Sequence, residues 1–300
     1  MNFSECRFSE RVHIRNEGIG MELQTPLPHM KYALAYAENN KPLIRWAGGK
    51  GLLLKHILPH TPATFNQYYE PFFGGGALFF ALQPENALLS DSNEELMNCY
   101  VQIRDHSEDI ITLLSPLEST KEAYYAVRES APQDAVGRAV RFLYLMKLAF
   151  NGVHRVNAQG RFNVPYGRTR NAPVCDSSHI QLISALLSSA QLSHGDFEIA
   201  VSGAQKGDFV YFDPPYTVAH SNNGFIEYNA SIFSWDDQIR LATVARTLAE
   251  RGCKVLISNA DHASIHALYG YFQSESITRA STIAASNKHR RQITECLFHN

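Results

Sequence analysis

Short apolar runs that end in a polar or acidic residue alternate with longer amphipathic stretches along most of the chain. The clearest run, residues 208–212, is apolar and aromatic after one acid, which predicts a buried strand. Residues 87–91 and 191–194 are shorter runs that end near an acid, and we expect them to be strands as well. Residues 135–150 show apolar positions at helical spacing and stop at an Asn-Gly pair. The alternation predicts an α/β fold, with a mixed sheet flanked by helices.

Capping and turn residues place the remaining elements. Ser234 is expected to cap a helix over 235–251, and Gly252 to end it. An antiparallel pair is expected at 272–278 and 293–298, completing the sheet. Further helices are expected over 31–38, 93–104, 107–149 (helical throughout), 177–188 and 262–269, with a strand over 254–258.

These elements divide the chain into three parts. Residues 1–40 have no clear periodicity and form an N-terminal extension to which we assign no function. Residues 41–105 and 190–300 together form the α/β domain, and residues 106–189 form a mainly helical insert. Within the insert, 153–156 and 161–164 predict a β-hairpin around a short loop that contains Gly160.

Composition narrows the class of protein. The chain has 300 residues, 45% of them hydrophobic, but no stretch approaches the roughly 20 apolar residues of a membrane span. Its first 20 residues lack the apolar core of a signal peptide. Five scattered cysteines and 13 histidines show no metal or redox spacing. We therefore expect a cytoplasmic protein that spans no membrane, binds no metal and works as a monomer.

The net charge of −2 argues against a generally basic protein, but the charge is unevenly distributed. No Asp or Glu occurs from Ala135 to Cys175, whereas seven Arg or Lys residues do. Such a run favours contact with phosphates, although a solvated basic face would look the same. A second basic patch, 288–291, fits either reading equally.

The central motif is Asp213-Pro214-Pro215-Tyr216, which directly follows the strand at 208–212. The prolines end the strand because they cannot donate to a sheet ladder. The Asp213 carboxylate and the Pro214 carbonyl can accept the two N–H bonds of an amino group on a base ring, and so stabilise the charge that develops when its nitrogen attacks. Tyr216 can stack on that base, a contact worth roughly 1–3 kcal/mol.

Two glycine turns precede the central motif. The first, 48–50, ends in a lysine where a helix begins, and a cation there is expected to meet an anion such as a ligand carboxylate. The second, 74–76, follows a strand that ends at Glu70, as in nucleotide-binding units. The dinucleotide fingerprint is absent, and the acid and aromatic residues before this turn suit adenosine linked to a cationic sulfonium. Asp91 is placed for ribose hydroxyls or for helix capping, and Phe197 for flanking an adenine or for the core.

The ordered set of motifs resembles the DNA adenine methylase (Dam) family of N6-adenine methyltransferases, over roughly residues 42–297. The matching stretches are RWAGGK, EPFFGGG, LLSDSN, LAFNGVHRVNAQGRFNVPYGR, DPPY, LISN and RASTIAASNKHRRQITECL. The resemblance implies a Rossmann-like fold that uses S-adenosylmethionine, a target-recognition insert, and double-stranded DNA as partner. The family's dominant target is GATC. This chain departs from the usual family residues at Arg45, Val153 and His154.

The residue patterns and the resemblance together give the expected site. The catalytic residues are Asp213, Pro214, Pro215 and Tyr216. The cofactor-binding residues are Trp46, Lys50, Glu70, Phe72, Gly74, Gly76, Asp91, Phe197 and Asp213. The DNA-binding residues are Arg45, Phe150, Asn151, Val153, Arg155 and Arg168, with Phe150 filling the space left by a flipped base and Arg168 contacting a phosphate.

The expected reaction is adenine N6 methylation of a base flipped out of the duplex. Two other readings stay open on the residues alone. One is a DNA-binding module on a methyltransferase fold without activity, and the other is a different methyl acceptor, cytosine N4 or a protein glutamine. A role in restriction-modification or in replication and repair marking fits equally.

Overall fold

The structure, a computed structural model, describes residues 42–167, 173–218, 233–280 and 292–300. Four expectations lie outside these residues: the N-terminal extension at 1–40, the helix at 31–38, Arg168, and the basic patch at 288–291.

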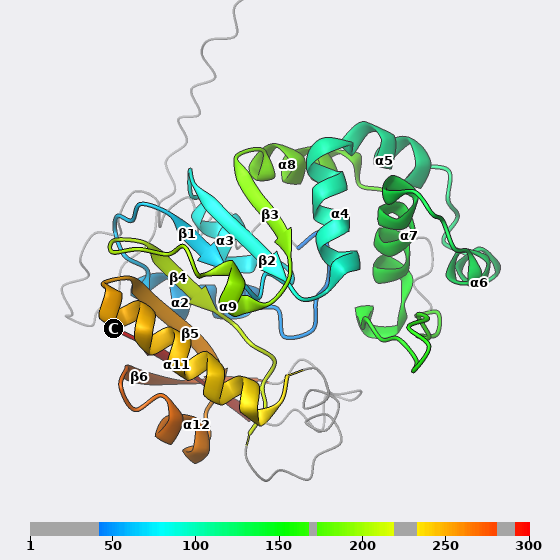
Figure 1. The fold of residues 1–300 in the computed structure, drawn as a ribbon. Helices are drawn as coiled ribbons and strands as arrows, with labels where there is room; N and C mark the ends of the chain where they lie inside the picture. Colours follow the sequence, from blue (N-terminus) through cyan, green and yellow to red (C-terminus); the bar gives the residue numbers. More distant parts are fainter. Residues whose placement is uncertain (1–41, 168–172, 219–232, 281–291) are drawn as a thin grey trace, which may run out of the picture.

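A seven-stranded sheet in the order β3-β2-β1-β4-β5-β7-β6 forms the centre of the fold (Figure 1). Its strands are β1 (Tyr68–Glu70), β2 (Ala87–Asp91), β3 (Ala190–His194), β4 (Phe209–Phe212), β5 (Lys254–Ala260), β6 (Gln273–Ala280) and β7 (Gln292–His299). Strand β7 runs antiparallel to both of its neighbours, and the other pairings are parallel. The mixed α/β sheet predicted from the sequence is therefore confirmed, including the closing antiparallel pair.

Helices pack on both faces of this sheet, and others lie to one side of it. The α-helices of the described residues are α2 (Leu54–Ile57), α3 (Ala77–Leu82), α4 (Glu94–Asp105), α5 (Ser107–Leu114), α6 (Lys121–Glu129), α7 (Ala135–Leu148), α8 (Ser177–Leu187), α9 (Phe197–Ala200), α11 (Trp235–Arg251) and α12 (Ala263–Leu268). Ser234 caps α11 through a capping box and Gly252 ends it in a left-handed conformation, as predicted.

The apolar run of β4 reflects burial on both faces. Phe209 and Tyr211 belong to a hydrophobic cluster with α3, α4 and α7, whereas Val210 and Phe212 belong to a second cluster with α11 and α12. A central parallel strand that is covered on both sides has a continuously apolar sequence, without the alternation of apolar and polar residues seen in half-exposed strands.

The expectation of continuous helix over 107–149 was wrong. The chain instead forms α5, α6 and α7, with breaks that contain Pro116 and Pro132. Proline lacks the N–H that helix continuation needs and restricts the residue before it. In Figure 1 α5, α6 and α7 lie together to one side of the sheet, beyond β3 and α4. The domain boundaries at 105/106 and 189/190 stay predictions.

The predicted hairpin pairs through backbone bonds from Asn157 N–H to the Arg161 carbonyl and from Asn163 N–H to the Arg155 carbonyl. The regular ladder is limited to isolated bridges, Val156 with Phe162 and Ala149 with Tyr166. The hairpin is thus an irregular ribbon joined to the end of α7.

Candidate active site

The central motif and the second glycine turn lie at neighbouring positions on one edge of the sheet. Strands β1 and β4 are parallel neighbours, and the sheet grows from them in opposite directions, to β2 and β3 on one side and to β5 on the other. Glu70 ends β1 and Asp213 follows β4. In open α/β sheets the carboxyl ends of strands at such a switch point form the ligand-binding crevice.

Lys50 lies against the central motif. Its Nζ is 2.9 Å from Oδ1 of Asp213 and 3.6 Å from Oε2 of Glu295, and it donates a 2.9 Å hydrogen bond to the Gly48 carbonyl. The whole residue is buried. The cation was expected to meet an anion, and in this structure the anions are two carboxylates of the protein itself.

Two contacts hold the Tyr216 side chain in place, one at its hydroxyl and one at its ring. Its hydroxyl donates a 2.6 Å hydrogen bond to Oε2 of Glu295, and Nζ of Lys50 lies 4.6 Å from the centre of its ring. Burial, with the nearby charges of Asp213 and Glu295, raises the pKa of Tyr216 well above its ordinary value. The ring is therefore held in one place as a neutral, stackable surface.

Sequence reasoning missed two polar residues that support this motif. Glu295 lies on β7 and is 1% exposed, and Gln238 on α11 is fully buried. Gln238 donates to the Pro215 carbonyl at 3.3 Å and accepts hydrogen bonds from Asn259 and Tyr269. The available signal for Gln238 was a polar residue on the otherwise apolar face of a helix, since such groups need a partner inside the protein.

The second glycine turn wraps closely around its neighbours. Gly74 and Gly76 have φ angles of 49° and 65°, in the left-handed region. A Cβ at Gly74 would lie 2.8 Å from the Trp46 ring. Asp91 accepts hydrogen bonds from the Gly74 and Asn93 N–H groups at 3.0 and 2.9 Å. Asn93, not Asp91, caps α4, while the Asp91 carboxylate retains lone pairs for ribose hydroxyls.

Glu70 is a buried acid at the same edge. It accepts a 2.7 Å hydrogen bond from the Tyr68 hydroxyl. Burial raises its pKa to about 8, with a further contribution from the charge of Asp213. A protonated carboxyl beside a ligand crevice would be ionised by a bound cation.

Aromatic rings line the approach to the turn. The Trp46 ring stacks on His154 of the hairpin at 5.6 Å, and Phe72 stacks on Phe197 at 5.4 Å. Phe197 is itself buried, and the Arg240 guanidinium lies 4.2 Å from the centre of its ring. The core role considered for Phe197 is thus observed, and its contact with an adenine stays a prediction.

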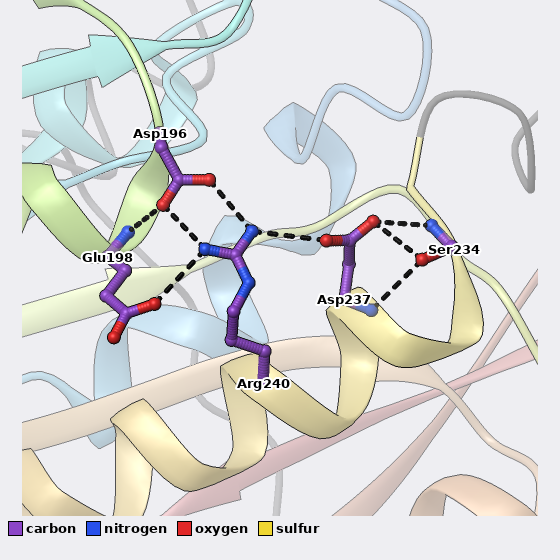
Figure 2. A network of polar contacts seen from close by, with 5 residues as sticks. All are labelled: Asp196, Glu198, Ser234, Asp237 and Arg240. Carbon is purple, nitrogen blue, oxygen red and sulfur yellow. Dashed lines mark hydrogen bonds and ion pairs between the residues drawn. The ribbon is translucent and has the colours of Figure 1, made fainter.

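Arg240 fixes α9 against α11 through a network of acids (Figure 2). It binds both oxygens of Asp196 at 2.7 and 2.8 Å, and also contacts Glu198 and Asp237. The hydrogen bonds from Arg240 lower the pKa of Asp196. The network anchors the segment from which Phe197 projects.

The expected DNA-binding residues lie at the end of α7 and on the hairpin. Phe150 and Val153 are exposed large apolar side chains, at 54% and 37%, and Asn151 has a φ of 56°. Arg155 is exposed and donates to Asn163 at 2.8 Å. Arg45 lies beside this group, because a Cβ at Gly152 would be 3.1 Å from the Arg45 Cβ. Residues distant in sequence thus meet on one surface.

The basic field expected along 135–175 is weaker than the sequence suggested. Arg138 binds Glu94 and Glu95 of α4, and Arg141 donates to the carbonyls of Val127 and Arg128. Acids of α4 thus neutralise Arg138, although the stretch of sequence around Arg138 contains none. Two of the seven cations, Arg138 and Arg141, therefore hold helices together.

The described residues contain one group of side chains with metal-ligand atoms close together, Asp261, His266 and Cys296, all within 4.8 Å. Asp261 and His266 form an ion pair of 2.7 Å with one another. Neither belongs to the crevice at Glu70 and Asp213.

The acidic residues at this edge of the sheet fit S-adenosylmethionine in their chemistry. Glu70, Asp91 and Asp213 lie at the ends of adjacent strands, where carboxylates complement a sulfonium, an amino group and ribose hydroxyls. The two left-handed glycines of the turn, Gly74 and Gly76, pack against aromatic side chains of the protein, and their contact with a cofactor stays a prediction.

This sheet and site define the α/β fold of S-adenosylmethionine-dependent methyltransferases. Residues 46–283 match the family described as D12 class N6 adenine-specific DNA methyltransferase, and the chain belongs to that family. It is 41% identical over 272 residues to a type II methyltransferase of Lactococcus lactis subsp. cremoris, covering 87% of this chain and 96% of that protein. It is 36% identical to a type II methyltransferase of Methanocaldococcus jannaschii, covering 87% and 99%. It is also 31% identical to a DNA adenine methylase of Vibrio cholerae, covering 87% and 96%. Among the described residues, no helix has the length and apolar character to cross a bilayer.

Proposed function

We propose that this protein transfers the methyl group of S-adenosylmethionine to N6 of an adenine flipped out of double-stranded DNA, within the sequence GATC, and that it acts as a monomer in the cytoplasm. The observation that supports the reaction most directly is the arrangement of Asp213 and Tyr216. A carboxylate with 18% of its side chain exposed stands beside a fixed aromatic ring at the sheet's ligand-binding edge.

Each residue of the central motif has a separate role in the proposed reaction. Asp213 accepts one hydrogen of the target amino group and the Pro214 carbonyl accepts the other, which stabilises positive charge on the attacking nitrogen. Tyr216 stacks on the flipped base and holds its amino group in line, so that alignment supplies much of the acceleration. Pro215 fixes the turn, and Gln238 binds its carbonyl. When bound, S-adenosylmethionine supplies an electrophilic methyl group.

The DNA-facing residues would offset the few kcal/mol that base flipping costs. Phe150 is exposed at the end of α7 and could fill the space that the base leaves. Asn151 and Arg155 have side chains that pair bidentately with adenine and guanine edges in the major groove. The GATC assignment rests on the similarity of these hairpin residues to those of the Dam family.

The deciding experiment is radiolabelled methyl transfer to two duplexes that differ only in one GATC site, followed by analysis of the labelled base. We expect N6-methyladenine in the GATC duplex alone, and an Asp213→Ala variant that binds the duplex but transfers almost no label. Label on both duplexes would reject the inferred specificity. Label recovered as N4-methylcytosine would show that the methyl acceptor is cytosine and not adenine. An enzyme that binds the cofactor but transfers no methyl group would support the alternative of a DNA-binding module without activity.

A further inference from the structure

Glu295 is a buried carboxylate in contact with the reacting end of the site, although it lies outside every expected site position. It sits on β7, opposite Ala260 of β5 and Ile277 of β6, and is 1% exposed. Its Oε2 accepts the Tyr216 hydroxyl at 2.6 Å and lies 3.6 Å from Nζ of Lys50. Burying a charge is unfavourable unless it is paired, so this acid needs these contacts.

Lys50 is shared between two carboxylates. Its ammonium is 2.9 Å from Asp213 and 3.6 Å from Glu295, and its side chain is 5% exposed. In the proposed reaction Asp213 must accept a neutral N–H from the target base. A charge-assisted hydrogen bond from an ammonium is stronger than one from a neutral amino group. Because Oδ1 is fully buried, the substrate can reach only the other oxygen of this carboxylate, and Lys50 lowers the negative charge that the carboxylate offers there.

We propose that Glu295 is a positioning residue: its negative charge shares the Lys50 ammonium with Asp213, and its oxygen holds the Tyr216 hydroxyl. The inference rests on the proposed function and adds a residue to it. With Glu295 in place, Lys50 is held between two carboxylates and leaves more negative charge on Asp213. Without that second carboxylate, Lys50 pairs with Asp213 alone, and Asp213 becomes a weaker acceptor for the substrate N–H.

Glu295→Gln isolates the charge, because glutamine keeps the side-chain shape and an oxygen that can accept from Tyr216. We expect the single-turnover methylation rate at saturating duplex and cofactor to fall about 10- to 100-fold, the range seen when a residue that orients a site group from behind is lost. The dissociation constant of the cofactor should stay within about threefold, and Glu295→Asp should restore part of the rate. Glu275→Gln is the matched control: it removes an exposed carboxylate from the paired strand β6 and should leave the rate unchanged.

The double variant with Lys50→Gln separates positioning from simple loss of structure. If Glu295 acts through Lys50, adding Glu295→Gln to Lys50→Gln should cost little further rate, because the ammonium that weakens Asp213 as an acceptor is already gone. This comparison also holds if Glu295→Gln alone is too unstable to assay. Additive losses, or a Glu295→Gln rate within about twofold of the wild type, would overturn the proposal. A wild-type enzyme that transfers no methyl group would count against the proposed function instead.

Discussion

At the residue scale, the acids at the sheet edge differ in the number of groups that stabilise their charge. The Tyr68 hydroxyl and the Phe79 backbone N–H lower the pKa of Glu70, but the effect of burial is larger and raises that pKa to about 8. Burial also raises the pKa of Asp91, but three backbone N–H groups oppose that effect. In the free protein near pH 7, Glu70 is therefore largely protonated, whereas a bound cation would favour its ionised form.

This difference predicts a proton linkage for cofactor binding. A cation beside Glu70 lowers its pKa below about 8, so binding at pH 7 should release a proton from this group. Affinity should accordingly increase as pH rises toward about 8 and level off above it, by at most about tenfold per pH unit. Calorimetric titration in two buffers of different ionisation enthalpy measures the released protons directly.

The Glu70→Gln variant should not release this proton. Only the titration of the ligand itself should remain, and that is the same for the variant and the wild type. Glu85→Gln, an exposed acid between β1 and β2, serves as the control and should behave as the wild type. Equal proton release from the wild type and Glu70→Gln would place the cation elsewhere in the crevice.

Local sequence identified the central motif but not its partners. Asp213 directly follows an apolar strand and Tyr216 follows the double proline, so their position at the sheet edge could be predicted. Glu295 could not, because one acid in a strand gives no hint of the two residues that approach it from 245 and 79 positions away. Arg138 shows the same limit, since its acidic partners belong to another helix.

At the element scale, the turn between β1 and α3 depends on glycine for both conformation and space. Gly76 has a φ of 65°, and a Cβ there would lie 2.7 Å from the Phe73 and Phe80 rings. Both rings are buried in the core and cannot move aside cheaply. The sequence predicted the turn, but the contact with these rings required the structure.

Gly76→Ala should therefore lower the free energy of unfolding by about 2–4 kcal/mol, the sum of a left-handed residue and an overpacked core. Gly160→Ala is the matched control, because it has a φ of 74° with nothing within 4 Å of the added Cβ. In that variant only the strain of a left-handed backbone contributes, so its free energy of unfolding should fall by about 1 kcal/mol. Urea unfolding measures both losses, and similar values for the two glycines would contradict a packing role for Gly76.

The junction of α9 and α11 depends on Arg240 (Figure 2). Arg240→Ala removes a bidentate contact to Asp196 and a cation over Phe197. Because the Arg240 side chain is 38% exposed, solvent screening should limit the stability loss to about 1 kcal/mol. If Phe197 flanks the cofactor adenine, the dissociation constant of the cofactor should rise as well.

Arg246→Ala tests whether that effect is specific. Arg246 lies on the same helix, pairs with Glu250 and lies 5.4 Å from the centre of the exposed Tyr271 ring, so its removal should change the melting temperature little and leave cofactor affinity unchanged. A melting temperature for Arg240→Ala that matches this control would show that the network in Figure 2 adds nothing to the junction.

At the scale of the whole molecule, the hairpin connects the sheet edge at Glu70 and Asp213 with the recognition surface, the name used here for the exposed group of expected DNA-binding residues at the end of α7 and on the hairpin. His154 stacks on Trp46, which packs on the glycine turn, while Gly152 packs on Arg45. The order of motifs predicted both surfaces, but the sequence could not show that residues 45–46 join them. A base captured at Tyr216 and a duplex read by the hairpin would thus be aligned by one set of contacts.

This connection makes the hairpin the place to test sequence recognition. Arg155→Ala should weaken discrimination at one base pair of the site by about 1–3 kcal/mol, measured as kcat/KM on duplexes that carry single base-pair changes. Arg161→Ala changes the same residue type on the opposite arm of the hairpin, where the side chain is also exposed. It should alter affinity for all the duplexes alike, in a salt-dependent manner, or not at all. If Arg155→Ala instead weakens every duplex equally, Arg155 contacts a phosphate and the base must be read by another residue of the recognition surface.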